Sequence, residues 1–307
     1  MQRSINTLLH NHLFHLCLLM LLLVQPATAQ PPTAPDNAAS ITDSTVQLSS
    51  GKIFYRDSGG AGVPVIFLHA GSGNSMMWEY QISAFTEAGY RFIAIDYRGV
   101  DTAAGAAGTV DASTRISELV ALLALDRFHL VGTALGGGRA LEYALAHQDQ
   151  LRSITVANSI GNVQDREYTE MGSRIRPPQF NQLPLEMREL GPSYRAANPE
   201  GVERWLALSG EERAAAAPNV PPASGNQPAA AASNPNLVTW ARLEALSVPT
   251  LLLTGAADLY TPPSVLRMFT AHMKQAESQV IIESGHSAYW ESPEQFNSLV
   301  LEFINKY

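Results

Sequence analysis

Short apolar runs alternate along most of the chain with longer stretches in which apolar side chains recur three and four residues apart. Continuous apolar runs are typical of strands buried on both faces of a sheet, and the longer spacing is typical of the helices that cover it. Strands are predicted at residues 63–68, 90–96, 128–131, 153–158, 250–255 and 279–283. Helices are predicted at residues 76–87, 113–125, 139–145, 264–273 and from 292 onward. This order predicts the α/β class, with a mostly parallel sheet flanked by helices.

Two segments depart from this alternation. Residues 46–55 alternate apolar and polar positions, which predicts a β-hairpin at a sheet edge. Residues 161–237 begin with polar, helical stretches and continue, at 214–236, with an irregular part rich in Ala, Pro, Asn and Ser. We interpret residues 161–237 as a helical cap inserted into one core, and a disordered linker between two domains is the alternative. The core then has two parts, residues 44–160 and 238–307.

The N-terminal segment has the organisation of a secretory signal peptide. Arg3 precedes an apolar run from Leu13 to Val24, and Ala27-Thr28-Ala29 provides the small residues of a cleavage site. Residues 1–29 are therefore predicted to be removed on export, and an uncleaved membrane anchor is the alternative. Residues 30–43, rich in Pro, Ala, Thr and Asn, are predicted to be a disordered lead into the core. We expect a soluble, periplasmic or secreted protein that does not associate with membranes after cleavage.

Composition excludes several kinds of partner and chemistry. The chain has 20 basic and 28 acidic residues, a net charge of −8, and no basic cluster, which argues against binding to nucleic acid or to an anionic membrane. The only cysteine, Cys17, lies in the predicted signal peptide, so the exported chain has neither a disulfide nor a thiol nucleophile. No spacing of His and carboxylate residues suggests a metal site, and we expect no metal and no cofactor.

One stretch combines the features of a nucleophile elbow. The apolar run at residues 128–131 leads into a tight turn bracketed by Gly132 and Gly136, and the helix predicted at 139–145 follows. A strand, a tight turn and a helix form the setting in which G-x-S-x-G holds a catalytic serine, and glycines let the two backbones approach closely. The position of that serine is occupied by Ala134. A methyl group cannot attack a carbonyl carbon.

A carboxylate and a histidine follow two later strands. Asp258 comes after the strand predicted at 250–255, and His286 comes after the strand predicted at 279–283. The carboxyl ends of parallel strands form the edge at which open α/β sheets bind their ligands. A carboxylate there can fix the tautomer of a histidine and support its positive charge.

In combination, these motifs resemble the α/β-hydrolase superfamily, in its capped branch of esterases, lactonases and C–C hydrolases. The resemblance extends from about Val46 to the C-terminus and includes the order elbow, acid, histidine. It rests on the elbow and on Phe67-Leu68-His69-Ala70-Gly71, Asp96-Tyr97-Arg98-Gly99, Gly255-Ala256-Ala257-Asp258 and Gly285-His286. The resemblance implies an α/β-hydrolase fold, with Asp258 as the triad acid and His286 as the base. It also implies an oxyanion hole formed by the backbone N–H groups of Ala70 and Leu135.

The chain departs from the family pattern where the chemistry is concentrated. Ala134 stands at the nucleophile position, and the residues at two other motif positions, Thr133 and Ala70, are also atypical. Hydrolysis through an acyl-enzyme at position 134 is therefore not available. Three other hydroxyl groups are considered as substitutes: Thr133 adjoins Ala134, Ser72 lies in the predicted oxyanion loop, and Ser159 follows the next strand. Side chains next to each other on a tight turn point in different directions, which argues against Thr133.

The remaining histidines and several arginines have less specific interpretations. His69 is expected to have a structural role at a strand end, and His129, His147 and His272 lie away from the other candidate residues. The arginines of the predicted cap either bind a substrate carboxylate or form a solvated surface, and they include Arg174, Arg176 and Arg195.

These observations favour an exported hydrolase for a small carbonyl substrate, such as an ester or a lactone, in which His286 activates water. A cofactor-free lyase, isomerase or oxygenase is an alternative, because a base and an anion hole suffice to form an enolate-like anion. A non-catalytic protein that binds a small ligand, and a serine hydrolase with an engineered alanine, are two further alternatives. The sequence does not indicate an oligomeric state.

Overall fold

The structure is a computed structural model, and it describes residues 40–98, 111–209 and 237–307. The predicted signal peptide and the irregular part of the predicted cap, residues 214–236, lie outside the described residues, as does the lead up to residue 39.

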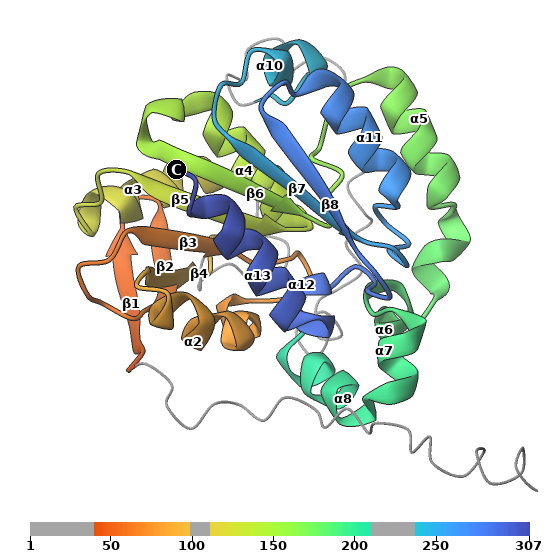
Figure 1. Ribbon diagram of the computed structural model, residues 1–307, viewed down its shortest axis with the longest axis horizontal. Coiled ribbons are helices and arrows are strands. Elements are labelled where there is room, and N and C mark those ends of the chain that lie inside the picture. Colours follow the sequence, from red (N-terminus) through yellow and green to blue (C-terminus); the bar gives the residue numbers. More distant parts are fainter. Residues whose placement is uncertain (1–39, 99–110, 210–236) are drawn as a thin grey trace, which may run out of the picture. The chain divides into compact units, whose positions relative to one another are not determined.

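The core is an eight-stranded sheet with the strand order β1-β2-β4-β3-β5-β6-β7-β8 (Figure 1). The first two strands form a hairpin that pairs antiparallel with β4, and all other neighbouring strands are parallel. This confirms the predicted mostly parallel sheet. The strands are β1 (Thr42–Leu48), β2 (Gly51–Asp57), β3 (Pro64–Leu68), β4 (Arg91–Ile95), β5 (Phe128–Thr133), β6 (Leu151–Ala157), β7 (Thr250–Gly255) and β8 (Ala276–Ile281).

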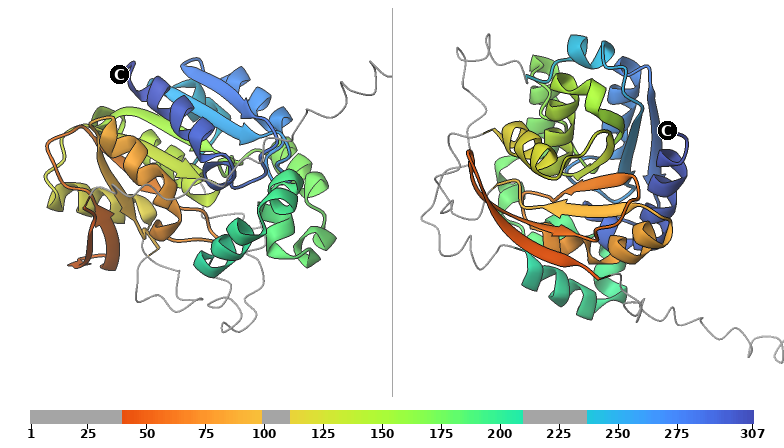
Figure 2. Two further views of the ribbon diagram at one scale, coloured as in Figure 1. Left: turned by 60° about the horizontal axis from the view of Figure 1, so that its bottom comes forward. Right: turned by 90° about the vertical axis from the view of Figure 1, so that its left-hand side faces the viewer.

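Helices cover both faces of the sheet (Figures 1 and 2). The helices are η1 (Ser75–Trp78), α2 (Glu79–Glu87), α3 (Ala112–Leu122), α4 (Leu135–Ala146), η2 (Gln148–Gln150), α5 (Arg166–Ile175), η3 (Pro178–Gln182), α6 (Leu185–Glu189), α7 (Pro192–Ala197), α8 (Pro199–Leu208), α10 (Trp240–Glu244), α11 (Pro263–His272), α12 (Ala288–Glu291) and α13 (Pro293–Ile304). Within the described ranges, no helix has both the length and the apolar composition needed to cross a membrane.

The apolar core is divided by the sheet into two clusters. Because successive side chains of a strand point to opposite faces, Ile66 of β3 packs in the cluster with α3, α4 and α11, whereas Phe67 packs in the cluster with α2 and α13. Residues 65–68 are all fully buried. This burial on both faces explains why the central strands are apolar without alternation.

Three predicted boundaries differ from those of the structure. The last strand, β8, begins and ends earlier than the predicted residues 279–283. Its polar residues belong to an edge strand and pair with β7 through their backbone. Ile282 lies past the end of the strand and is 71% exposed. Helix α4 begins at Leu135 and not at residue 139. Its first turn contains Gly136, Gly137 and Gly138, which disfavour helix on propensity but allow close packing. β1 also begins two residues inside the predicted lead, at Thr42.

The segment between β6 and β7 forms helices α5 to α8, which lie beyond the carboxyl ends of the central strands (Figure 1). Hydrogen bonds connect α8 to two parts of the core that lie far apart in the sequence. The Asn74 side chain donates to the Leu208 carbonyl (2.9 Å), and the Trp290 indole donates to the Gly201 carbonyl (3.2 Å). These helices therefore form one wall over the strand ends where Asp258 and His286 lie.

Candidate active site

The turn between β5 and α4 has strained backbone geometry at Ala134. This residue has φ 51° and ψ −115°, a conformation that residues with a Cβ rarely adopt. Its N–H donates to the Ala157 carbonyl of the neighbouring strand (2.9 Å), which helps to hold the turn. A Cβ added to Gly132 would lie 2.3 Å from the Gly136 carbonyl oxygen, and one added to Gly136 would lie 2.3 Å from the Leu68 oxygen. The glycines are required because the strand and helix backbones touch.

His286 and Asp258 are in direct contact. The Nδ1 atom of His286 lies 3.0 Å from both carboxylate oxygens of Asp258, and both side chains are buried. The loops that carry them are packed tightly, since a Cβ on Gly255 would come within 2.2 Å of the Ser284 and Gly285 carbonyl oxygens. Since the Asp258 oxygens accept hydrogen bonds, Nδ1 carries a proton and Nε2 is the ring atom available to a ligand.

Four further donors hold the Asp258 carboxylate in place. They are the side chains of Asn158 (3.0 Å) and Thr254 (3.2 Å) and the backbone N–H groups of Tyr260 (2.7 Å) and Thr261 (2.9 Å). Burial favours the neutral acid, but the attraction of His286 and these hydrogen bonds outweigh it and lower the pKa of Asp258. The carboxylate is thus kept ionised and fixed in orientation.

The environment of His286 favours its charged form. Burial lowers the pKa of the ring, but the charge and hydrogen bond of Asp258, with a contribution from Glu189, outweigh burial and raise it above 6.5. The Tyr260 ring packs against the imidazole, with 4.2 Å between ring centroids. A histidine held in this way can accept a proton and remain stable as the cation.

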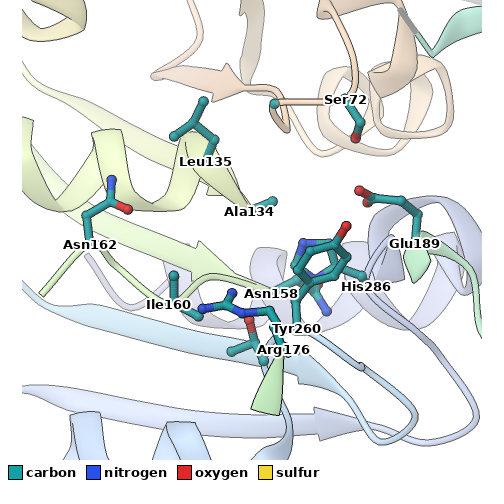
Figure 3. A pocket seen from close by; sticks show the side chains of 12 residues that line it. Ser72, Ala134, Leu135, Asn158, Ile160, Asn162, Arg176, Glu189, Tyr260 and His286 are labelled. Atoms are coloured by element: carbon teal, nitrogen blue, oxygen red, sulfur yellow. The ribbon is translucent and has the colours of Figure 1, made fainter. Parts of the chain in front are cut away.

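His286 faces a cavity of about 240 Å³ (Figure 3). Its walls come from the elbow, from the loop after β3, from the ends of β6 and β7, and from the segment between these two strands. They are formed by Gly71, Ser72, Ala134, Leu135, Asn158, Ile160, Asn162, Arg176, Glu189, Tyr260, Thr261 and His286. Most of the surface that faces the cavity is apolar, and its polar groups are few and convergent, as is common for small-molecule sites.

The structure brings together most of the residues predicted for the oxyanion hole and elbow. Ala134 and Leu135 line the cavity, and Leu135 is the first residue of α4, where backbone N–H groups have no partner within the helix. Ala70 is buried but does not line the cavity, whereas the next two residues, Gly71 and Ser72, do. The role of the Ala70 N–H as the second donor of the oxyanion hole therefore stays a prediction.

The three alternative hydroxyl groups are placed differently. Ser72 lines the cavity (Figure 3), whereas Thr133 is fully buried behind the elbow. The Ser159 hydroxyl accepts the Gly161 N–H (3.1 Å) and does not line the cavity. Only Ser72, of these three, is in position to contact a ligand.

Other candidates fall inside and outside the site. His69 donates from Nδ1 to the Ala70 carbonyl (2.7 Å) and stacks on Tyr97, and burial lowers its pKa to about 4. Burial also lowers the pKa of His129 to about 4, and its ring contacts the Ser153 hydroxyl (2.8 Å). Of the predicted arginines, Arg176 lines the cavity, and neither Arg174 nor Arg195 does. No group of three possible metal ligands occurs among the described residues.

One further residue of the site, Glu189, is not predicted by the sequence pattern. This residue ends helix α6, is 5% exposed and lines the cavity (Figure 3). Burial is the main reason that its pKa is raised. A single glutamate in a short polar helix has the pattern of a solvated surface, so the sequence carried no signal for its burial.

Comparison with known proteins identifies the family. The model of the alpha/beta hydrolase fold family matches residues 63–293, so the chain belongs to this family. It is 24% identical over 298 residues to a 2-hydroxy-6-oxononadienedioate/2-hydroxy-6-oxononatrienedioate hydrolase of Paraburkholderia xenovorans, covering 87% of this chain and 98% of that protein. It is 28% identical over 280 residues to a 2-hydroxy-6-oxo-6-phenylhexa-2,4-dienoate hydrolase of Burkholderia cepacia, covering 84% and 92%.

Solved structures share the fold. A thermophilic esterase from Thermogutta terrifontis superposes with a TM-score of 0.65 and 24% identity, covering 86% of this chain and 98% of that one. The enol-lactonase from Burkholderia xenovorans LB400 superposes with a TM-score of 0.65 and 16% identity, covering 85% and 100%.

Proposed function

We propose that the protein is a hydrolase of a small carbonyl compound, in which His286 activates a water molecule directly. The observation that carries this proposal is the position of His286, bonded through Nδ1 to both oxygens of Asp258 (3.0 Å) and facing a cavity beside Ala134. The hydrolases, esterase and enol-lactonase that the chain resembles support a substrate with an ester, a lactone or a related bond.

The proposed reaction uses the elbow as an anion site. The carbonyl oxygen of the substrate accepts hydrogen bonds from the N–H of Leu135 and from an N–H of the loop at residues 70–72, at the positive end of α4. Water attacks the carbonyl carbon while one of its protons moves to Nε2 of His286, and the electrons of the C=O bond move to the oxygen. When the C=O bond re-forms, the bond to the leaving group breaks, and the leaving group takes the proton from His286.

Two side chains have supporting roles in this proposal. Asp258, which is fully hydrogen bonded, holds the tautomer of His286 and stabilises the imidazolium. Arg176, on the wall contributed by the segment between β6 and β7, is suited to hold a carboxylate of the substrate. The methyl group of Ala134 takes the place of a nucleophile, and no acyl-enzyme forms.

Cofactor-free lyase or isomerase chemistry is a second candidate. Ala134 favours it, because a base and an anion hole can form an enolate-like anion without a nucleophile. Hydrogen–deuterium exchange at a carbon next to the substrate carbonyl, without net hydrolysis, would support this candidate over hydrolysis.

We further propose that the protein is exported and that residues 1–29 are removed. The support is the sequence pattern of Arg3, the apolar run and Ala27-Thr28-Ala29. Cell fractionation and the N-terminal sequence of the mature protein test this. A mature N-terminus at Gln30 in the exported fraction is expected, and a full-length chain retained inside the cell would contradict it.

The function is tested with the purified protein and the variants Ala134→Ser and His286→Ala, on a panel of aryl esters, lactones and oxo-dienoates. Turnover by the unmodified protein that is lost in His286→Ala is the expected result. Turnover only in Ala134→Ser, with a burst of acyl-enzyme, would contradict the proposal and indicate a serine hydrolase that has lost its nucleophile. If none of the three proteins turns over any substrate, a non-catalytic ligand-binding protein is favoured.

A further inference from the structure

A second carboxylate, that of Glu189, faces the same cavity as His286. It comes from helix α6, outside the strands and loops that carry Ala134, Asp258 and His286. Figure 3 shows the carboxylate pointing into the space beside Ala134, with the Ser72 hydroxyl turned toward it. The cavity is therefore lined by a carboxylate that the proposed reaction has not yet used.

The backbone around Glu189 is fixed to the His286 loop. The Glu189 carbonyl accepts the N–H of Ser287, the residue after His286 (2.9 Å). On the other side, the Glu291 carboxylate accepts the N–H groups of Gly191 (2.7 Å) and Gly285 (2.9 Å). Because these bonds join α6 and the histidine loop at several points, the position of Glu189 relative to His286 is set by the fold.

The carboxylate of Glu189 differs from that of Asp258 in its hydrogen bonding. Both oxygens of Asp258 accept several donors, whereas the buried Oε2 of Glu189 makes no hydrogen bond of normal geometry among the described residues. The Ser72 hydroxyl acts on the Glu189 carboxylate and lowers its pKa, against the larger effect of burial. A buried acceptor without a partner is unfavourable, and carboxylates of this kind concentrate at functional sites. A hydrogen-bond donor brought into the cavity would satisfy this oxygen.

We propose that Glu189 is a catalytic residue that accepts a hydrogen bond from the attacking water while His286 takes the proton. This inference rests on the proposed hydrolytic function. Water has two hydrogens, and directing one to Nε2 of His286 and the other to Glu189 turns a lone pair toward the substrate carbonyl. Ala134, Glu189 and His286 all line the cavity in which this water would bind. In this step Glu189 accepts a hydrogen bond and takes up no proton, so the atoms and protons of the reaction are unchanged.

The charge of Glu189 also affects the titration of His286. Glu189 is one of the groups that raise the pKa of His286, after Asp258. Other charged or titratable groups act on this pair from the surrounding elements, namely Asp258, Arg176, Arg188, Tyr260 and Tyr289. Removing only the charge of Glu189 should therefore lower the pKa of His286 and leave the other contributions in place.

The test compares the pH dependence of kcat and kcat/KM in the unmodified protein, Glu189→Gln, Glu189→Asp and Glu186→Gln. Glu186 lies on the same helix and does not line the cavity, so Glu186→Gln is the matched control. For Glu189→Gln we expect kcat to fall at least about tenfold with KM nearly unchanged, since ordered attack is lost. The fall in activity at low pH should move to lower pH. Glu189→Asp keeps the charge and should restore the pH profile with part of the kcat.

Several results would overturn the inference. An unchanged kcat and pH profile in Glu189→Gln, while His286→Ala is inactive, would refute the role of Glu189 and leave the hydrolase proposal intact. A rise in KM alone would assign Glu189 to substrate binding instead. Full activity of His286→Ala would refute the proposed function itself, and the role of Glu189 with it. An NMR titration of His286 without substrate gives a second readout, in which Glu189→Gln must lower the pKa of the ring.

Discussion

The Nδ1 atom of His286 lies 3.0 Å from both carboxylate oxygens of Asp258, although the two residues are carried by loops after different strands. This contact fixes the ring, assigns the proton to Nδ1 and directs Nε2 to the cavity. The His286–Asp258 pair has the arrangement of a general base. It lies on the same cavity as the nucleophile elbow, in which Ala134 occupies the position of the nucleophile.

Replacing Asp258 with Asn should remove most of the activity without unfolding the protein. The amide keeps the shape of the side chain but cannot stabilise the imidazolium, and it can favour the wrong tautomer. We expect kcat to fall by about 10³–10⁴. Steady-state kinetics measure this, and Asp149→Asn, at an exposed position, is the control that should be unchanged. Near-normal activity in Asp258→Asn would show that the pair does no chemistry.

Activity should be lost at low pH with a midpoint above 6.5. His286 accepts a proton only in its neutral form, and Asp258 and Glu189 raise the pKa of the ring above that value despite its burial. Protonation therefore inactivates the base as the pH falls through the raised pKa. The pH profile of kcat/KM measures this midpoint. A midpoint well below 6.5 would mean that these carboxylates do not control the titration.

Replacing Ala134 with Gly should stabilise the fold or leave its stability unchanged. Ala134 has φ 51° and ψ −115°, which glycine adopts without a steric penalty. We expect a gain of up to about 1 kcal/mol in the free energy of unfolding. Ala140→Gly in helix α4 is the matched control, and we expect it to lose about 1 kcal/mol or more because glycine disfavours helix. Equal losses in both variants in denaturant titrations would argue against strain at the elbow.

Replacing Gly136 with Ala should destabilise the protein strongly. The new Cβ would lie 2.3 Å from the Leu68 carbonyl oxygen and 2.6 Å from that of His69, and both atoms are backbone. We expect a loss of about 2–4 kcal/mol in the free energy of unfolding. Gly172→Ala in helix α5 faces only the end of a flexible Arg176 side chain and should be neutral or stabilising. Thermal melts of the two variants test this, and similar melting temperatures would contradict it.

The parts of the fold set by local pattern could be predicted from the sequence. Continuous apolar runs predicted the central strands, and the glycines around Ala134 predicted the elbow. Both patterns can be recognised because each lies within a few consecutive residues. The edge strand β8 was placed too late, because its polar residues are held by pairing with β7 and not by burial. Pattern alone cannot report such pairing.

The site could be predicted only where its residues follow strands of the core. Asp258 and His286 were found because parallel strands bring their carboxyl ends to one edge. Glu189 was missed and Arg176 could not be separated from Arg174, because the segment between β6 and β7 has no regular relation to the sheet. Which of its polar residues turn inward depends on tertiary packing.

If His286 activates water without a covalent intermediate, the mass of the intact protein stays constant during turnover. The unmodified protein and His286→Ala are mixed with an aryl ester or lactone that is turned over, and protein mass and product are followed from the first turnover. We expect product without a burst or a mass increase in the unmodified protein, and at least about a hundredfold loss of turnover in His286→Ala. An acyl adduct on the unmodified protein, or unimpaired turnover by His286→Ala, would contradict it.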